Sequence, residues 1–280
     1  MTEFELSQRI EDLLVERNLR NMKTAQVALT PGYYLRAAQS LMPANGCIII
    51  GTGFPVTDTF ETDGPLGAIA LYDALKKMGA DPWLACAPPL SKVLAEDYQV
   101  LELTSRNLPD AQHEAKAALE RLQPQAIISI ERPGLAEDGC YYNMRGEDIS
   151  PRCAYFDPFL EQANCPTVAI GDGGNEIGMG NIRAAIATLD INASVTGCDE
   201  LLVADVSNWG AYGLIAFFEL WSDLPLLEEI APTKILQYLS ARGSVDGVTR
   251  ENTLTEDGLD AEEGASVIEG LRQLIHSTKS

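Results

Sequence analysis

Short apolar runs that alternate with stretches of helical periodicity dominate the middle of this 280-residue chain. The apolar runs cover residues 47–50, 83–87, 126–130, 167–170 and 201–204. They are hydrophobic almost throughout, as parallel strands buried on both faces are. Stretches with apolar residues every three or four positions cover residues 66–78, 111–122, 156–163, 182–189 and 211–221. Strands that alternate with helices pair in parallel. The sequence therefore predicts an α/β fold with an open, mainly parallel sheet of about five or more strands and helices on both faces.

Helical patterns flank this core on both sides. Before it, an amphipathic helix is marked by Leu6, Ile10, Leu13 and Leu14, and a second pattern covers residues 33–41. After it, residues 226–239 and 267–275 have helical periodicity. We predict one α/β domain over residues 1–280, divided into a helical N-terminal segment (1–45), a core (46–222) and a helical C-terminal segment (223–280). The polar, glycine-containing residues 243–263 are interpreted as a hinge or flexible segment.

The charge of the chain argues against several classes of partner. Its 20 basic and 41 acidic residues give a net charge of -21, which opposes binding to nucleic acids and anionic membranes because such contacts depend on Lys and Arg. No apolar run approaches the roughly 18 residues that span a bilayer, and the first residues are acidic where a targeting presequence would be basic. Six cysteines without a C-x-x-C pair indicate reduced thiols. We expect a cytoplasmic protein and leave open whether it forms a homo-oligomer.

A glycine-rich loop follows the fourth apolar run. Residues 171–181, GDGGNEIGMGN, contain five glycines, a density that suits backbone lying close to a ligand. The loop presents Asp172, Asn175 and Glu176 and leads into a predicted helix, whose free N–H groups attract anions. It is not a dinucleotide fingerprint, because Glu176 occupies the position of the last glycine, and it lacks the Lys of a P-loop. An enzyme acting on a phosphate ligand stays an alternative, as does a tight turn without a ligand.

Two other loops are expected at the same edge of the sheet, since ligands of open parallel sheets bind beyond the carboxyl ends of the strands. The loop after the first run carries three carboxylates and no basic residue: Asp58, Glu61 and Asp63. The loop after the third run carries Arg132 and Arg145, whose planar guanidinium groups suit carboxylates. A small zwitterion would fit between them. The alternative is that these arginines pair with the acids as structural links.

The three loops contain five ordered motifs. They are residues 52–55 (TGFP), 61–65 (ETDGP), 131–134 (ERPG), 141–146 (YYNMRG) and 171–180 (GDGGNEIGMG). Together they resemble the D-glutamate cyclase family, over about residues 46–221. The resemblance implies a hydro-lyase whose small-molecule substrate is D-glutamate, which it cyclises to 5-oxo-D-proline with loss of water.

That reaction needs a base for the α-amine and an electrophilic clamp on the side-chain carboxyl. As catalytic residues we predict Asp63, Glu131, Asp172 and Glu176. As substrate-binding residues we predict Thr52, Gly53, Arg132, Tyr142, Asn143, Arg145, Gly173, Gly174 and Asn175. In this scheme Arg132 or Arg145 holds the α-carboxylate, and the N–H groups of Gly173 and Gly174 stabilise the developing oxyanion. The chemistry requires no cofactor. If a metal takes part, Asp172, Asn175 and Glu176 are its predicted ligands and Mg²⁺ or Mn²⁺ the predicted ion. The alternative to an enzyme is a non-catalytic sensor of an acidic amino acid.

Overall fold

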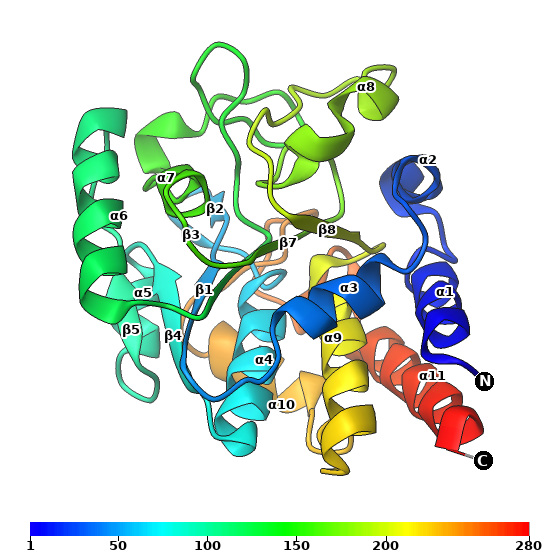
Figure 1. The fold of residues 1–280 in the computed structure, drawn as a ribbon. Helices are drawn as coiled ribbons and strands as arrows, with labels where there is room; N and C mark the ends of the chain where they lie inside the picture. Colours follow the sequence, from blue (N-terminus) through cyan, green and yellow to red (C-terminus); the bar gives the residue numbers. More distant parts are fainter. Residues whose placement is uncertain (280) are drawn as a thin grey trace.

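A six-stranded parallel sheet forms the centre of the molecule (Figure 1). The computed structural model describes residues 1–279. The strands are β1 (Cys47–Thr52), β4 (Asp81–Cys86), β5 (Val100–Glu102), β6 (Ala126–Ile130), β7 (Thr167–Gly171) and β8 (Glu200–Val203). Their order is β5-β4-β1-β6-β7-β8, and every neighbouring pair is parallel. The predicted α/β fold with an open parallel sheet is confirmed.

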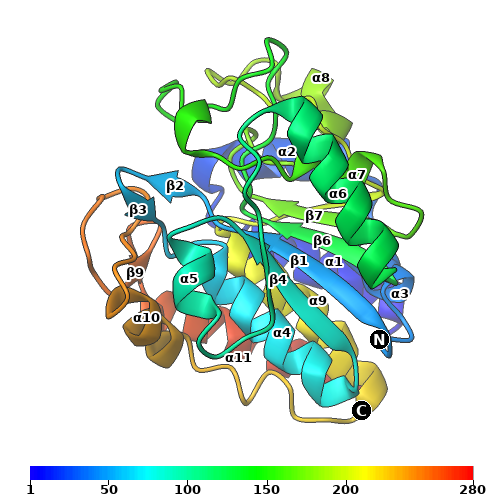
Figure 2. The same cartoon turned by 90° about the vertical axis from the view of Figure 1, so that its left-hand side faces the viewer.

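Helices cover both faces of the sheet, as Figures 1 and 2 show. One face carries α3 (Tyr33–Ser40), α4 (Pro65–Met78) and α9 (Ser207–Ser222), backed by α1 (Glu3–Leu14), α10 (Pro232–Ser240) and α11 (Ala261–Lys279). The other face carries α6 (Leu108–Leu122) and α7 (Asp157–Glu161). The shorter elements are α2 (Met22–Ala28), α5 (Leu90–Leu94), α8 (Arg183–Ile186) and the 3₁₀ turns η1 (Leu19–Asn21), η2 (Ser150–Arg152) and η3 (Met179–Ile182). Two small hairpins pair β2 (Pro55–Val56) with β3 (Thr59–Phe60) and β9 (Thr255–Glu256) with β10 (Leu259–Asp260).

The terminal helices pack onto the sheet domain through one apolar core. Leu6 and Leu14 of α1 and Leu271 of α11 are fully buried in the same cluster as Ile49 and Ile128 of the central strands. Burying such side chains contributes about 1.5–3 kcal/mol each relative to leaving them exposed. Among residues 1–279, every helix falls short of the length and apolarity that a bilayer crossing demands.

The first turns of α4 and α9 approach each other closely at the carboxyl edge of the sheet. A Cβ on Gly67 would lie 2.8 Å from the Cα of Asn208, so this crossing requires glycine. The Asn208 side chain accepts hydrogen bonds from the N–H groups of Gly64 (2.8 Å) and Gly67 (2.7 Å). Gly64 itself has φ +88°, a conformation that favours glycine. This junction places Asp63 directly beside the N-terminus of α9.

Several local predictions differ from the structure. Strand β5 was not predicted, because an edge strand of three residues with one buried side chain carries little hydrophobic signal. The helix predicted over residues 182–189 is only the four-residue α8 preceded by η3. The helix predicted from residue 226 begins at Pro232, since proline is favoured in the first turn of a helix.

The segment interpreted as flexible, residues 243–263, is instead folded around a buried carboxylate. Asp246 is fully buried and accepts hydrogen bonds from Val248 N–H, Thr249 N–H, Thr255 Oγ1 and Gly258 N–H at 2.7–2.9 Å. The polar residues of this segment therefore satisfy its own backbone and do not keep it solvated. The segment forms one wall of the candidate site.

Candidate active site

Three of the predicted catalytic carboxylates meet at the carboxyl edge of the sheet. Glu131 and Asp172 follow the adjacent strands β6 and β7, in which Ile130 pairs with Ile170. Asp63 enters from the loop that joins β1 to α4. Oxygen atoms of the three carboxylates all lie within 4.8 Å of one another, and all three side chains are buried. We call these residues the carboxylate cluster.

The N-terminus of α9 binds the carboxylate cluster. The Ser207 N–H donates to Asp63 (3.0 Å) and to Asp172 (3.2 Å), and the Asn208 N–H donates to Asp63 (2.8 Å). The Ser207 hydroxyl donates to Glu131 Oε2 at 2.5 Å. The positive end of the helix dipole and these donors stabilise negative charge on the cluster.

Arg20, which sequence reasoning missed, pairs with the carboxylate cluster from the opposite side. Its Nη2 lies 2.5 Å from Asp172 Oδ2 and 2.5 Å from Asp257 Oδ2, and its Nε donates to the Asp172 carbonyl at 3.1 Å. Burial alone would lower the pKa of Arg20, but the charges of Asp172 and Asp257 outweigh it and raise the pKa above its ordinary value. Burial alone would raise the pKa of Asp257, but Arg20 and hydrogen bonds from Asp172 and Asp63 bring it below its ordinary value.

Burial disfavours the charged forms of the cluster. It raises the pKa of Asp63 well above its ordinary value, and repulsion from Asp257 adds to the rise. Burial likewise raises the pKa of Glu131, with Glu176 as the strongest repelling neighbour. The pKa of Asp172 is also raised by burial, although Arg20 opposes this. Closely spaced buried carboxylates cannot all ionise together, so protons or a cation must neutralise part of the cluster.

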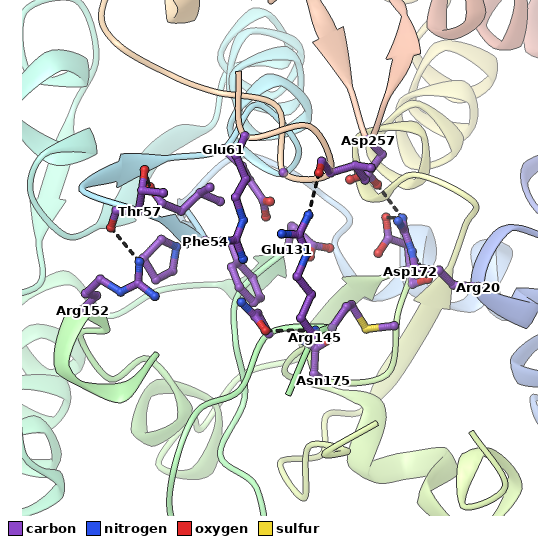
Figure 3. Close-up of a pocket in the computed structure, with 17 residues that line it drawn as sticks. Arg20, Phe54, Thr57, Glu61, Glu131, Arg145, Arg152, Asp172, Asn175 and Asp257 are labelled. Carbon is purple, nitrogen blue, oxygen red and sulfur yellow. Dashed lines mark hydrogen bonds and ion pairs between the residues drawn. The ribbon is translucent and has the colours of Figure 1, made fainter. Parts of the chain in front are cut away.

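A cavity of about 160 Å³ opens onto the cluster (Figure 3). At its inner end lie the buried carboxylates Glu61, Glu131 and Asp172. Toward solvent it is lined by Arg145, Arg152 and Arg250, whose side chains are exposed or half-buried. Of the charged residues predicted for the loops after β1 and β6 to divide in this way, Glu61 and Arg145 line the cavity, whereas Arg152 and Arg250 were not predicted.

Backbone strain is concentrated around this cavity. Over residues 1–279, nine residues other than glycine have positive φ, and five of these line the cavity. The five are Arg20 (φ 49°), Thr57 (48°), Glu131 (47°), Arg250 (62°) and Asp257 (52°). Such conformations cost on the order of 1–3 kcal/mol each and persist where the surrounding structure imposes them, which is typical of functional sites. In Glu131 the strained turn directs the carboxylate from the end of β6 into the cluster.

The glycine-rich loop binds one of its own carboxylates. Glu176 is buried, and its Oε2 accepts the Gly174 N–H at 2.7 Å. N–H groups of Gly174 and Gly173 lower the pKa of Glu176, but burial outweighs them and the pKa is raised. The N–H groups predicted to bind the oxyanion thus face a carboxylate of the protein. Asn175 lines the cavity, and its Nδ2 donates to the Tyr142 carbonyl at 2.8 Å.

Arg132 does not occupy the position predicted for a substrate ligand. Its buried guanidinium donates to the carbonyls of Thr52 (3.1 Å), Gly53 (3.3 Å) and Ala154 (2.5 Å) and lies over the ring of Phe156. A guanidinium that is buried among carbonyl groups stabilises the loop after β1 and does not face a substrate carboxylate. Thr52 and Gly53 likewise contribute backbone to this interaction and do not line the cavity of the cluster.

Of the substrate-binding residues predicted in the loop after β6, some line the cavity and one points away from it. The Tyr142 hydroxyl donates to Asp138 at 2.6 Å, outside the cavity. Asn143 lines the cavity and accepts the Arg145 N–H at 3.0 Å, which shapes the turn. Arg145 lines the cavity, and its Nη2 donates to the Val248 carbonyl at 2.8 Å. Of the two predicted arginines, Arg145 is the one placed to meet a ligand.

The carboxylate cluster also differs from the predicted metal site. Within residues 1–279, the one group of carboxylate, His or Cys ligands close enough to share an ion is Asp63, Glu131 and Asp172. Only Asp172 is common to this group and to the predicted set, in which Asn175 and Glu176 were the other ligands. Adjacent strands bring Glu131 to Asp172, a proximity that one loop considered alone does not reveal.

Two comparisons with known proteins bear on the site, and one of them covers it completely. The family model described as "D-glutamate cyclase-like, C-terminal" matches residues 10–272, which include Arg20, the cluster and Asp257. The human protein "D-glutamate cyclase, mitochondrial" is 32% identical over 208 residues. The match covers 64% of this chain and 33% of the human protein, so the chain corresponds to about a third of that relative's length.

Proposed function

The chain belongs to the D-glutamate cyclase-like family, and from that premise we propose that it is a hydro-lyase that converts D-glutamate to 5-oxo-D-proline and water. One observation supports this most strongly: buried carboxylates and exposed or half-buried arginines line a single small cavity. An amino acid with an ammonium group and two carboxylates has the complementary charge distribution.

The proposed reaction forms one C–N bond and breaks one C–O bond. The α-ammonium loses a proton, and its nitrogen attacks the side-chain carboxyl carbon. One oxygen of that carboxyl leaves with two protons as water, and the third ammonium hydrogen stays on the lactam nitrogen. Because both reacting groups belong to one molecule, holding the substrate in a ring-like conformation supplies much of the acceleration, with effective molarities of about 10⁵ M or more in well-oriented cases.

The geometry suggests a role for each group. In our proposal Glu131, which follows β6 in a strained turn and accepts the Ser207 hydroxyl at its Oε2, takes the ammonium proton. Asp63 and Asp172 are held by N–H groups of α9 and surround the same point. Arg145 holds the α-carboxylate at the outer end of the cavity. Bidentate pairing there would fix the orientation of the substrate.

The two alternatives make different demands on the site. A phosphate ligand is disfavoured, because the N–H groups of the glycine-rich loop already serve Glu176 and the inner cavity is acidic. A sensor of an acidic amino acid would bind D-glutamate without consuming it.

Chiral chromatography after incubation with each enantiomer of glutamate tests the proposal. We expect 5-oxo-D-proline from D-glutamate and little product from L-glutamate. Glu131→Gln should remove most of the activity, whereas Asp58→Asn should keep it, because Asp58 is exposed and lies outside the cavity. Binding of D-glutamate without product would favour the sensor. Equal activity of Glu131→Gln and the wild type would remove Glu131 from the mechanism.

A further inference from the structure

The carboxylate cluster lies among other buried acids with little positive charge nearby. Glu61, Glu131 and Asp172 line the cavity at exposures of 7%, 6% and 3%, and Asp63 and Glu176 are each 1% exposed. In the part of the chain that the structure describes, the ion pairs that reach this group all come from Arg20, which contacts Asp172 and Asp257. A buried excess of carboxylates is costly unless a cation or protons compensate it.

Two neutral oxygen atoms in the segments that lead to the site are buried and have no hydrogen-bond partner: Thr52 Oγ1, at the end of β1, and Asn175 Oδ1, in the loop after β7. Their residues are 0% and 2% exposed. Leaving such an oxygen buried and unpartnered typically costs about as much as a lost hydrogen bond, so each points to a ligand that supplies the missing interaction.

The hydroxyl of Thr52 faces the space between Glu131 and the residue after Asp63. If Gly64, the residue after Asp63, carried a Cβ, that atom would lie 2.9 Å from Thr52 Oγ1 and 2.7 Å from the Cβ of Glu131. Thr52 ends β1, directly beside Ile130 at the end of β6. The hydroxyl therefore lies at the base of the cluster.

The amide oxygen of Asn175 converges with the carboxylate of Glu176. If Gly173 carried a Cβ, that atom would lie 3.0 Å from Asn175 Oδ1 and 2.7 Å from Glu176 Oε1. The other Glu176 oxygen lies 2.9 Å from the corresponding position of Gly171. Both side chains thus gather beside the backbone of residues 171–173, from which Asp172 enters the cluster. A side chain on either glycine would fill this space.

From this convergence we propose that Asp63, Glu131 and Asp172 bind one divalent cation, Mg²⁺ or Mn²⁺, with Glu176, Asn175 and Thr52 as nearby oxygen donors. Carboxylate, amide and hydroxyl oxygens are the ligands that these hard cations prefer. Both histidines of the chain, His113 in α6 and His276 in α11, lie in helices that do not carry the cluster. The absence of nitrogen and sulfur ligands from the donor set disfavours Zn²⁺.

The proposal that a cation binds depends only on the cluster and the oxygen atoms around it. A catalytic role for the cation depends, in addition, on the proposed function. A bound divalent cation would polarise the side-chain carboxyl of the substrate and make its carbon a better electrophile. Glu131 would then both hold the ion and, through its other carboxylate oxygen, take the ammonium proton.

Titration of chelator-treated protein with Mn²⁺, followed by the electron paramagnetic resonance signal of free Mn²⁺ without glutamate, tests the proposal. We expect saturable binding of one Mn²⁺ per chain. Asp63→Asn and Glu131→Gln should each weaken binding at least tenfold, by comparison with the roughly 10–100-fold losses seen when even an outer partner of a metal ligand is changed. Asp58→Asn, which changes an exposed carboxylate of the same loop, should bind as the wild type does.

A second measurement on the wild type removes any dependence on variant folding. Anomalous scattering from Mn²⁺-soaked crystals should place the ion between Asp63, Glu131 and Asp172. The absence of saturable binding, equal binding by the variants and the wild type, or an ion located elsewhere would overturn the proposal. Turnover of D-glutamate without Mn²⁺ binding would overturn the metal site alone, whereas Mn²⁺ binding without turnover would leave the site standing and overturn the proposed function.

Discussion

Replacing Arg20 tests the structural account of the site, because this residue links the N-terminal segment to the cluster. Its Nη2 contacts Asp172 and Asp257 at 2.5 Å, and the side chains of these two acids are 4% and 9% exposed. Arg20→Met would keep the apolar stem but leave two buried carboxylates without their cation. Removing one partner of a buried pair costs about 3–5 kcal/mol. Because burial raises the pKa of Asp172, protonation can relieve part of the charge, and we expect a loss of about 3 kcal/mol.

Urea denaturation of four proteins measures this cost and assigns it. They are the wild type, Arg20→Met, Asp257→Asn and the double variant. Since Asp257→Asn removes one of the charges left unpaired, the double variant should be less destabilised than the sum of the single changes, with a coupling of at least about 1 kcal/mol. Arg272→Met is the control, because the ion pairs that Arg272 forms with Glu228 and Glu269 are exposed, and such pairs are worth about 0–1 kcal/mol. A loss below 1 kcal/mol for Arg20→Met, or additive single changes, would refute this account of the ion pairs.

Three further predictions concern single side chains. Arg145→Lys should lower kcat/KM for D-glutamate by a factor that corresponds to about 1.5–3 kcal/mol, because one ammonium cannot reproduce bidentate pairing; normal kinetics in a folded variant would reduce Arg145 to a structural link. Glu176→Gln should lower the melting temperature and the activity together, since its Oε2 accepts the Gly174 N–H; lost activity at an unchanged melting temperature would instead assign Glu176 to the chemistry. Burial raises the pKa of Glu256 from its ordinary value of 4.5 to about 7, so the native state holds a proton that the unfolded chain releases. The stability from this group is fully present below pH 4.5 and is lost as the pH rises through 7. Glu256→Gln should therefore flatten the fall in unfolding free energy across this range, and parallel pH profiles for variant and wild type would contradict the assignment.

The sheet could be predicted because the burial of each strand is visible in a few consecutive residues. Strands buried on both faces are continuously apolar, and all five predicted runs lie in or overlap strands of the sheet. The edge strand β5 lacks that signal, since one of its three residues is buried. It could also be predicted that Asp63, Glu131 and Asp172 lie in loops at one edge of the sheet, because residues after parallel strands gather there.

The rest of the site depends on tertiary contacts that no local pattern encodes. Arg20 and Asp257 are 237 positions apart, and Asp257 belongs to a polar segment that resembles a flexible one. The direction of Arg132 could not be predicted either. Its neighbour Glu131 has positive φ, and the chain turns so that Arg132 reaches the carbonyls of Thr52 and Ala154 on the other side of the loop. Positive φ at residues other than glycine becomes visible only in the structure.

Formation of the C–N bond is the central claim, and nuclear magnetic resonance can observe it directly. D-Glutamate labelled with ¹⁵N at the amine and ¹³C at the side-chain carboxyl would be incubated with the purified protein, with and without Mn²⁺. The account predicts that the carboxylate ¹³C signal is replaced by a lactam signal split by a one-bond coupling to ¹⁵N, and that the L enantiomer changes little. An unchanged carboxylate signal under both conditions, or the coupling appearing with L-glutamate alone, would contradict it.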